Sequence, residues 1–284
     1  MKIKKAVIPA GGLGTRFHPV SLSIPKEMLP IIDRPILQIA VEELIDYGVE
    51  EIIIVISPWK TMIEEYFKES ANAGGLFSSH RPKNSHDVRF TYIAQDEAKG
   101  LGHAVYLTRE AAGADPFFLV LPDDVFNPED SNLQALAHVY ERDRGSVVTL
   151  EKVPEEDVHR YGIVKGEPLR NDVLKIDSLV EKPAPEDAPS DLAVIGRYLL
   201  APDIFDALEK TKPGRHGELQ LTDALNILAR EHRVFGCEHA GRRYDCGTIE
   251  GWITANIRML LASRKHDDDF RRLVRKILSE TSED

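Results

Sequence analysis

Residues 6–17 read AVIPAGGLGTRF, and residues 24–38 read IPKEMLPIIDRPILQ. The first stretch includes a short apolar segment, 4–9, whose composition predicts a buried strand. Three glycines follow that strand, and glycine lets backbone N–H groups approach an anion closely. Arg16 and Lys26 would bring two positive charges to this loop, which suits a triphosphate. The two stretches together therefore predict a phosphate-binding loop.

Two familiar phosphate loops do not fit this pattern. The dinucleotide fingerprint needs a third glycine where this chain has Phe17, and the P-loop needs a Gly-Lys-Ser/Thr sequence that is absent. A simple dinucleotide-dependent oxidoreductase is therefore disfavoured. Taken alone, GGLGTR is also compatible with a tight turn between a strand and a helix. The PKEMLP segment at residues 25–30 favours phosphate binding over that turn.

Outward from the loop, the first half of the chain alternates strands and helices. Apolar residues at helical spacing predict a helix over 36–48, and the β-branched run at 50–57 predicts a strand covered on both faces. Ser57-Pro58 resembles an N-cap followed by a first-turn proline, so a helix should open there and reach about residue 70. Repeated units of this kind predict a parallel sheet with helices on both faces. The other elements expected in this half are strands 89–95 and 117–122 and helices at about 102–112 and 133–142.

After about residue 146 the pattern changes to short β segments, and two helices close the chain. A last strand is expected near Tyr244. We expect the polar loop 71–87 of the first half to be a surface connection, with covering a site as the alternative. The remaining expected elements are strands 147–153, 162–165, 174–181 and 193–199 and helices at about 202–210, 219–231, 250–263 and 268–279.

The composition is that of an ordinary folded protein. The 284 residues fit one large α/β domain with appendages. The formal net charge of −11 argues against broad binding to nucleic acid or anionic membranes. The N-terminal apolar run is too short for a signal peptide, and no apolar stretch of about 18 residues occurs, so we expect a cytoplasmic location. Cys237 and Cys246 match no zinc-ligand spacing and should be buried small side chains.

Further motifs follow in order along residues 100–248: GLGHAV, LPDD, YGIV, VEKP, GRYLL, GELQLTDAL and YDCGT. With the two opening stretches they make residues 6–248 resemble the bacterial UTP–glucose-1-phosphate uridylyltransferases, or UDP-glucose pyrophosphorylases. The resemblance implies a Rossmann-like mixed, mainly parallel sheet with helices on both faces, the nucleotide-diphospho-sugar transferase fold. This chain departs from the family at Gly11, where the family usually has Ala and related thymidylyltransferases have Gly-Gly, and in the 71–87 loop.

The resemblance also implies how the chain is divided. Residues 1–250 would form the catalytic domain, with the nucleotide over about 1–145 and the sugar phosphate over about 146–250. Residues 251–284 would form C-terminal helices. Relatives of this type form dimers or tetramers, so a homo-dimer or homo-tetramer is expected, with the last two helices as a candidate interface and a monomer as the alternative.

For the nucleotide half the resemblance implies specific roles. Arg16 would neutralise the β,γ-phosphates, and Lys26 would lie beside the α-phosphate and this leaving group. Glu27 and Gln95 resemble the pair that reads the base. A carboxylate is a good acceptor for the N3–H of uracil, which thymine shares, so Glu27 does not separate the two bases. The alternative for Glu27 is an ion pair with Lys26. The other positions implied for nucleotide binding are Gly11, Gly12, Gly14, Thr15 and Gly100.

Asp123 and Asp245 match the family's two metal aspartates, and the resemblance implies Mg²⁺ as the cofactor. Asp123 follows an apolar strand, and a carboxylate there faces the usual ligand crevice of an open α/β sheet. Two carboxylates with phosphate oxygens and water make a good Mg²⁺ site. Asp124 is a candidate substitute for Asp123, but we expect it to be a turn residue. The residues that resemble the sugar-phosphate site are Gly162, Glu181 and Lys182; for the last two, a β-turn with a surface ion pair is the alternative.

The implied activity is Mg²⁺-dependent transfer of a uridylyl group from UTP to glucose 1-phosphate, with release of pyrophosphate. Arg16, Lys26 and Asp123 are the catalytic candidates, because positioning and charge neutralisation suffice when the nucleophile is already an anion. Two alternatives stay open: a dTTP-dependent glucose-1-phosphate thymidylyltransferase and a non-catalytic nucleotide-sugar binding regulatory protein. The second is disfavoured because the charged site residues are all present. The expected partners are UTP and glucose 1-phosphate, without nucleic acid or membrane.

Overall fold

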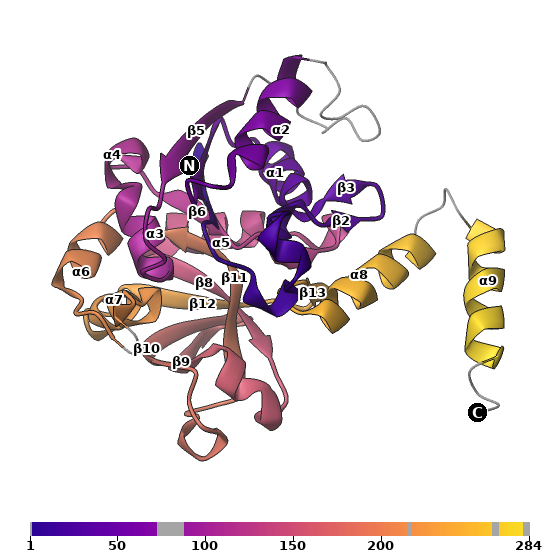
Figure 1. Ribbon diagram of the computed structural model, residues 1–284. Helices are drawn as coiled ribbons and strands as arrows, with labels where there is room; N and C mark the ends of the chain where they lie inside the picture. Colours follow the sequence, from indigo (N-terminus) through magenta and orange to yellow (C-terminus); the bar gives the residue numbers. More distant parts are fainter. Residues whose placement is uncertain (1, 73–87, 215–216, 263–266, 281–284) are drawn as a thin grey trace.

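In residues 2–72, 88–214, 217–262 and 267–280, which the computed structural model describes, nine strands form one mixed sheet (Figure 1). The strand order is β5-β4-β1-β6-β11-β8-β12-β10-β9. The first four strands in that order pair in parallel, as the alternating strands and helices predict. These four are β1 (Lys5–Ala10), β4 (Glu51–Ile56), β5 (Arg89–Ala94) and β6 (Phe117–Val120).

The second half of the sheet is largely antiparallel. β11 pairs antiparallel with β6 and thereby joins the two halves, while β8 and β12 pair in parallel. The other neighbouring pairs in this half, β11 with β8, β12 with β10 and β10 with β9, are antiparallel. The strands are β8 (Ser146–Lys152), β9 (Gly162–Arg170), β10 (Val173–Glu181), β11 (Leu192–Leu200) and β12 (Val234–Glu238).

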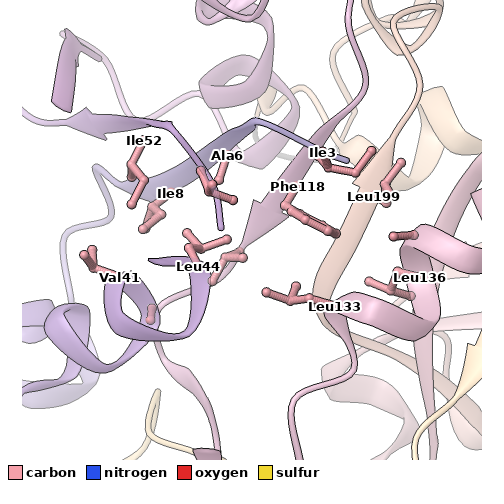
Figure 2. Close-up of a cluster of buried hydrophobic side chains, with 14 of the residues drawn as sticks. Ile3, Ala6, Ile8, Val41, Leu44, Ile52, Phe118, Leu133, Leu136 and Leu199 are labelled. Carbon is pink, nitrogen blue, oxygen red and sulfur yellow. The ribbon is translucent and has the colours of Figure 1, made fainter. Parts of the chain in front are cut away.

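Helices cover both faces of the sheet, which confirms the predicted α/β class (Figure 1). The buried run of β4 shows why: Ile52 and Ile54 enter one hydrophobic core, and Ile53 and Val55 enter the other. Figure 2 shows the first core, where Ile52 lies near residues of the helix 36–47. That face carries α1 (Ile36–Tyr47), α2 (Thr61–Asn72) and α5 (Leu133–Asp143), and the other carries α3 (Leu101–Leu107), α4 (Arg109–Ala112), α6 (Ile204–Lys210) and α7 (Leu221–Arg230).

Two smaller sheets lie beside the main one. β7 (Asp124–Phe126) pairs antiparallel with β13 (Arg243–Asp245), which brings the segment after β6 next to the end of the chain's second half. β2 (Pro30–Ile31) pairs with β3 (Arg34–Pro35). The helix α8 (Ile249–Ala262) packs against β13 and contacts α9 (Asp267–Glu280). Among the described helices, none is both long and apolar enough to span a membrane.

The predicted helix start at Ser57-Pro58 is wrong. The helix α2 begins at Thr61 instead. The Ser57 hydroxyl donates to the carbonyl of Gly11 at 2.5 Å, so it stabilises the glycine loop and does not cap a helix. Most of the 71–87 loop lies outside the described residues.

Two further differences have local causes. The single helix expected over 102–112 is divided into α3 and α4 at Thr108, whose hydroxyl donates to the Val105 carbonyl at 2.7 Å. The strand β12 is not predicted, because its five residues include Gly236, which reads as a strand breaker. A β-carbon at Gly236 would lie 2.3 Å from the Leu150 side chain, so close packing requires this glycine. Cys237, in the same strand, is buried and unpaired, as is Cys246, which confirms that expectation.

Candidate active site

Two side chains beyond β4 hold the carbonyl groups of the glycine loop. Lys60 Nζ donates to the carbonyls of Ala10 and Gly12 at 2.7 and 2.6 Å. Between them, the carbonyl of Gly11 accepts the Ser57 hydroxyl. Three consecutive carbonyls are therefore bound by one segment, which fixes the backbone path of the loop.

Glu27 lies beneath this loop and pairs with Lys60. Its carboxylate accepts the third hydrogen bond of the Lys60 ammonium, at 2.8 Å. Both side chains are 1% exposed, and burial raises the pKa of Glu27 and lowers the pKa of Lys60. The ammonium nevertheless has an acceptor for each of its three N–H groups, which supports the ionised pair. The alternative considered for Glu27 was an ion pair with Lys26, but the partner of its carboxylate is Lys60.

Gln95 contacts the other side of the loop. Its amide nitrogen lies 3.3 Å from the Gly100 carbonyl, to which it donates, and 3.1 Å from a ring nitrogen of His103. A β-carbon at Gly11 would lie 2.5 Å from the Gln95 amide oxygen. The glycine at position 11 therefore makes room for Gln95. Gly100 has φ +92°, and a β-carbon there would lie 2.9 Å from the Leu219 carbonyl, so this glycine also serves backbone packing.

Asp123, which follows β6, meets Lys26 from the PKEMLP segment. Lys26 Nζ donates to Asp123 Oδ2 at 2.5 Å. Burial is the largest single effect and opposes both charges, but the attractions around them together outweigh it: those of Asp123 and Glu27 for Lys26, and those of Lys26 and Arg16 for Asp123. The pKa of Lys26 is therefore raised and the pKa of Asp123 is lowered. Both groups are charged near neutral pH.

Asp245, at the end of β13, reaches the same place from the opposite half of the chain. A β-carbon at Gly247 would lie 3.0 Å from Asp245 Oδ1, 3.2 Å from Asp123 Oδ2 and 3.7 Å from Arg16 Nη1. Arg16 also donates to the Gly247 carbonyl at 3.5 Å. Three predicted site residues from distant parts of the sequence thus surround one glycine that has no side chain to separate them.

Asp124 is occupied by structural hydrogen bonds. One of its carboxylate oxygens accepts the Gly196 N–H at 2.6 Å, and the other accepts Arg243 at 2.6 Å. Arg243 also binds Glu151 at 2.6 Å, so it links β13 to β8. Asp124 therefore belongs to β7 and joins strands, and it is not the turn residue that we expected.

A cavity of about 320 Å³ opens beside these charges. Its wall includes Arg16, Asp123 and Asp245. On its sugar-half side, Glu181 accepts a hydrogen bond from Thr222 at 2.6 Å and pairs with Lys182 at 3.2 Å. The predicted residues that line this cavity are Arg16, Asp123, Asp245, Gly162, Glu181 and Lys182.

The remaining predicted residues lie outside that lining. Lys26 touches it through Asp123. Within the lining itself, Gly162 approaches Glu181 closely, since a β-carbon at Gly162 would lie 3.4 Å from the Glu181 carboxylate. Lys182 has φ +46°, an unusual conformation for a residue with a side chain, and its N–H donates to the Tyr161 carbonyl at 2.9 Å. The predicted residues absent from the cavity wall are Gly11, Gly12, Gly14, Thr15, Lys26, Glu27, Gln95 and Gly100.

The sequence of residues 5–260 matches the family model described as nucleotidyl transferase. The chain belongs to the nucleotidyl transferase family. It is 42% identical to the UTP–glucose-1-phosphate uridylyltransferase of Pseudomonas aeruginosa over 89% of this chain and 94% of that protein. It is 40% identical to the enzyme of the same name from Bacillus subtilis, over 94% of each.

Solved structures give the same family likeness. A UDP-glucose pyrophosphorylase complexed with UDP-glucose matches with a TM-score of 0.83 and 40% identity, over 92% of this chain and 100% of that one. A UTP-bound UGPase from Acinetobacter baumannii matches with a TM-score of 0.80 and 32% identity, over 96% and 98%. The matches cover nearly the whole of each relative, so the likeness includes both halves of the nucleotidyl transferase.

Sequence reasoning missed several residues of this nucleotidyl transferase site. Lys60 gave no signal, because it lies where the pattern predicts an ordinary helix start. Arg160 and Thr222 line the cavity and adjoin or belong to motifs, YGIV and GELQLTDAL, that already marked the site. The polar side chains inside or directly beside these motifs were the sequence signal that could have identified both residues. The other polar cavity residues that were not predicted are Tyr161, Tyr198, Glu218 and Gln220.

Proposed function

We propose that this nucleotidyl transferase converts UTP and glucose 1-phosphate into UDP-glucose and pyrophosphate. The relatives that cover nearly the whole chain carry this activity in their names. One observation carries the proposal: Arg16 and Asp123 from the first half line the same cavity as Glu181 and Lys182 from the second. A cavity with cations and carboxylates from both halves suits two phosphorylated substrates that must meet.

The proposed reaction is a direct in-line displacement. A phosphate oxygen of glucose 1-phosphate attacks the α-phosphorus of UTP. A new P–O bond forms while the bond from that phosphorus to the bridging oxygen breaks, and pyrophosphate leaves with the bonding electrons. The nucleophile is already an anion, so no side chain has to remove a proton. Catalysis then comes from positioning and from charge neutralisation.

The division of labour follows the charges. Arg16 and Lys26 bind the β,γ-phosphates and the α-phosphate of UTP. Lys182 binds the attacking phosphate, and Glu181 accepts hydrogen bonds from sugar hydroxyls. Residues 1–145 thus serve the nucleotide and residues 146–250 serve the sugar phosphate. These positive charges offset the unfavourable field of a chain with a net charge of −11.

Asp123 and Asp245 would hold Mg²⁺. Their oxygens converge on Gly247, and both are the hard donors that Mg²⁺ prefers. No group of three or more His, Cys, Asp or Glu side chains suited to a metal occurs among the described residues. Mg²⁺ commonly takes one or two carboxylates together with substrate phosphates, so this pair fits it. When bound, Mg²⁺ would neutralise charge on the phosphate oxygens.

Base recognition falls to the region of the glycine loop. Gln95 lies against Gly11 and beside Gly100, which supports its proposed contact with the uracil edge. The Glu27 carboxylate is buried with Lys60, so its contribution acts through the position of the loop. Substituting Gln95 by Ala should therefore raise KM for UTP more than it lowers kcat, as expected for lost substrate binding.

The test is a matrix of nucleotides against sugar 1-phosphates, with and without Mg²⁺, read by pyrophosphate release. We expect turnover that requires glucose 1-phosphate, is fastest with UTP and disappears when EDTA removes the metal. Faster turnover with dTTP would assign the thymidylyl reaction. Nucleotide binding without pyrophosphate release in any combination would contradict an enzymatic role. A cytoplasmic location and a homo-dimeric or homo-tetrameric state stay predictions.

A further inference from the structure

Arg160 lies at the edge of the proposed metal site. It ends a short 3₁₀ helix, Glu155–Arg160, immediately before the YGIV motif, and it lines the cavity. Its guanidinium donates through Nη2 to Asp245 and through Nη1 to Asp157, the latter at 3.3 Å. The guanidinium carbon also lies 5.5 Å from the centre of the Tyr161 ring, within the range of a cation–π contact. Asp157 and Tyr161 thus help to hold the Arg160 guanidinium beside Asp245.

The second carboxylate of the site is covered in the same way. Lys26 binds Asp123 Oδ2, the oxygen that faces Gly247. Arg160 binds Asp245 Oδ2, while Oδ1 of that residue accepts the Gly247 N–H at 3.0 Å. Each carboxylate proposed to hold the metal therefore carries a basic side chain of the protein itself. A divalent cation that binds these carboxylates must therefore displace a basic side chain or share an aspartate with it.

We propose that Arg160 occupies Asp245 in the free protein and releases it when the phosphorylated substrates bind, so that metal binding is coupled to substrate binding. This inference rests on the proposed function, because it takes Asp123 and Asp245 as the metal carboxylates. A guanidinium forms bidentate hydrogen bonds with phosphate as readily as with carboxylate. Substrate phosphates therefore supply a new partner for Arg160 and oxygen ligands for the metal in one step.

The geometry favours release over a permanent pair. The Arg160 side chain is 30% exposed and that of Asp245 is 25% exposed, so both reach the cavity. Asp157, three positions before Arg160, and Tyr161, directly after it, hold its guanidinium near the cavity wall after it leaves Asp245. Arg160 is therefore a positioning residue for the metal carboxylate in the free protein and a cation for phosphate in the complex.

Coupling of this kind is reciprocal. If UTP raises the affinity for the metal by some factor, the metal raises the affinity for UTP by the same factor. Removing the Arg160 charge should strengthen metal binding in the free protein and so reduce that factor. A purely structural arginine would instead change folding stability without changing the coupling.

The experiment measures Mn²⁺ as a probe of the metal site. Free Mn²⁺ is counted by electron paramagnetic resonance during titration of the full chain without nucleotide. We expect Arg160→Gln to bind Mn²⁺ about tenfold more tightly than the wild type, because a unit charge beside the ligand acts over a short distance even at a protein's effective dielectric. Adding Asp245→Asn to Arg160→Gln should remove the gain. The matched control is Arg170→Gln, which breaks an arginine–aspartate pair with Asp143 outside the cavity lining.

A second titration includes UTP without sugar phosphate, and water-proton relaxation separates the protein–Mn²⁺–UTP complex from Mn²⁺ bound to UTP alone. We expect the wild type to gain more Mn²⁺ affinity from UTP than Arg160→Gln gains. Equal Mn²⁺ affinity of folded wild type and Arg160→Gln without nucleotide, or an equal gain in Arg170→Gln, would overturn the role of Arg160 alone. If the wild type forms no ternary complex, the proposed metal site and the reaction that needs it fail as well. Melting curves of each variant establish that it is folded.

Discussion

Two lysine–carboxylate pairs each take one member from the PKEMLP segment, and they differ in what surrounds them. Lys60 and Glu27 are each 1% exposed beneath the glycine loop, and Lys60 also binds two loop carbonyls. Lys26 and Asp123 are 20% and 29% exposed at the cavity. The chemistry of the two pairs is the same, but only the second can exchange its partner for a ligand.

One segment, PKEMLP, thus serves both the fold and the site. Lys26 and Glu27 are neighbours in the sequence, yet Glu27 faces the interior and Lys26 faces Asp123. All three N–H groups of Lys60 bind Glu27 and the loop carbonyls, so none is left for a substrate. The buried pair therefore fixes the loop on which phosphates are proposed to rest. The cavity pair keeps its charges where phosphate and metal would replace each partner. The buried pair therefore supports the loop, and the open pair at the cavity is the one that a substrate or metal ion would contact.

The largest effect should come from breaking the open pair. Asp123→Asn removes a proposed metal oxygen's charge and the partner of Lys26, so we expect kcat to fall by about a hundredfold or more. Pyrophosphate release under saturating substrates measures it. The control is Asp177→Asn, an exposed carboxylate on β10. Near-normal turnover of folded Asp123→Asn would remove this residue from the mechanism.

Breaking the buried pair should act first on stability. Lys60→Met strands the Glu27 carboxylate and two loop carbonyls without a donor, so we expect the free energy of unfolding to fall by about 3–5 kcal/mol. Urea unfolding measures it. The double variant Glu27→Gln, Lys60→Met removes the stranded charge and should recover part of the loss. A Lys60→Met protein as stable as the wild type would contradict the proposed anchoring of the loop.

The pH dependence of Lys60→Met sharpens this test. Burial already raises the pKa of Glu27, and loss of Lys60 removes the largest opposing attraction. A buried carboxyl with a raised folded pKa binds its proton more tightly than the unfolded chain does, so stability is greatest below the unfolded value of about 4.3. It is lost as pH rises through the folded pKa. The deficit of Lys60→Met against the double variant should therefore grow from pH 5 to pH 8, in urea midpoints measured at each pH.

The contrast between cavity residues and the buried residues that support them also explains how much of the site could be predicted from the sequence. The glycine loop, Asp123 after an apolar strand and Asp245 in YDCGT were predictable, because each carries a local signature. The structure brings the two aspartates together with Arg16, as those motifs require. Cavity residues have motifs because chemistry restricts their type and spacing. β4 and α1 were predictable for a different local reason, because burial imposes a continuous β-branched run on the first and helical apolar spacing on the second.

Residues that act only through distant contacts could not be predicted. Lys60 binds carbonyls about fifty positions earlier, and nothing near it in the sequence separates this role from that of an exposed lysine. The YGIV motif marks the neighbourhood of Arg160, but its contact with Asp245 spans 85 positions and follows only from the fold. β12 was missed for a related reason, since Gly236 is explained by the Leu150 and Ile176 side chains on the two neighbouring strands.

A smaller effect is expected where the loop meets Gln95. A β-carbon at Gly11 would lie 2.5 Å from the Gln95 amide oxygen, and that flexible side chain can move aside. Gly11→Ala should therefore leave stability nearly unchanged and raise KM for UTP about three- to tenfold with little change in kcat, as expected for lost uniform binding. Steady-state kinetics measure both constants. Combining it with Gln95→Ala should add almost nothing, and additive losses would show that Gly11 acts independently of Gln95.

The smallest effect should come from an ion pair that is exposed to solvent and lies outside the proposed substrate site. Arg109 binds Asp206 and Glu209, and all three side chains are largely exposed, so water screens their attraction and ordering the side chains offsets much of it. We expect the urea midpoint and kcat of Arg109→Gln to match those of the wild type. A clear loss of stability would mean that an open ion pair can anchor this fold as the buried one does. Burial would then no longer explain why Lys60 fixes the loop while Lys26 remains available to a substrate.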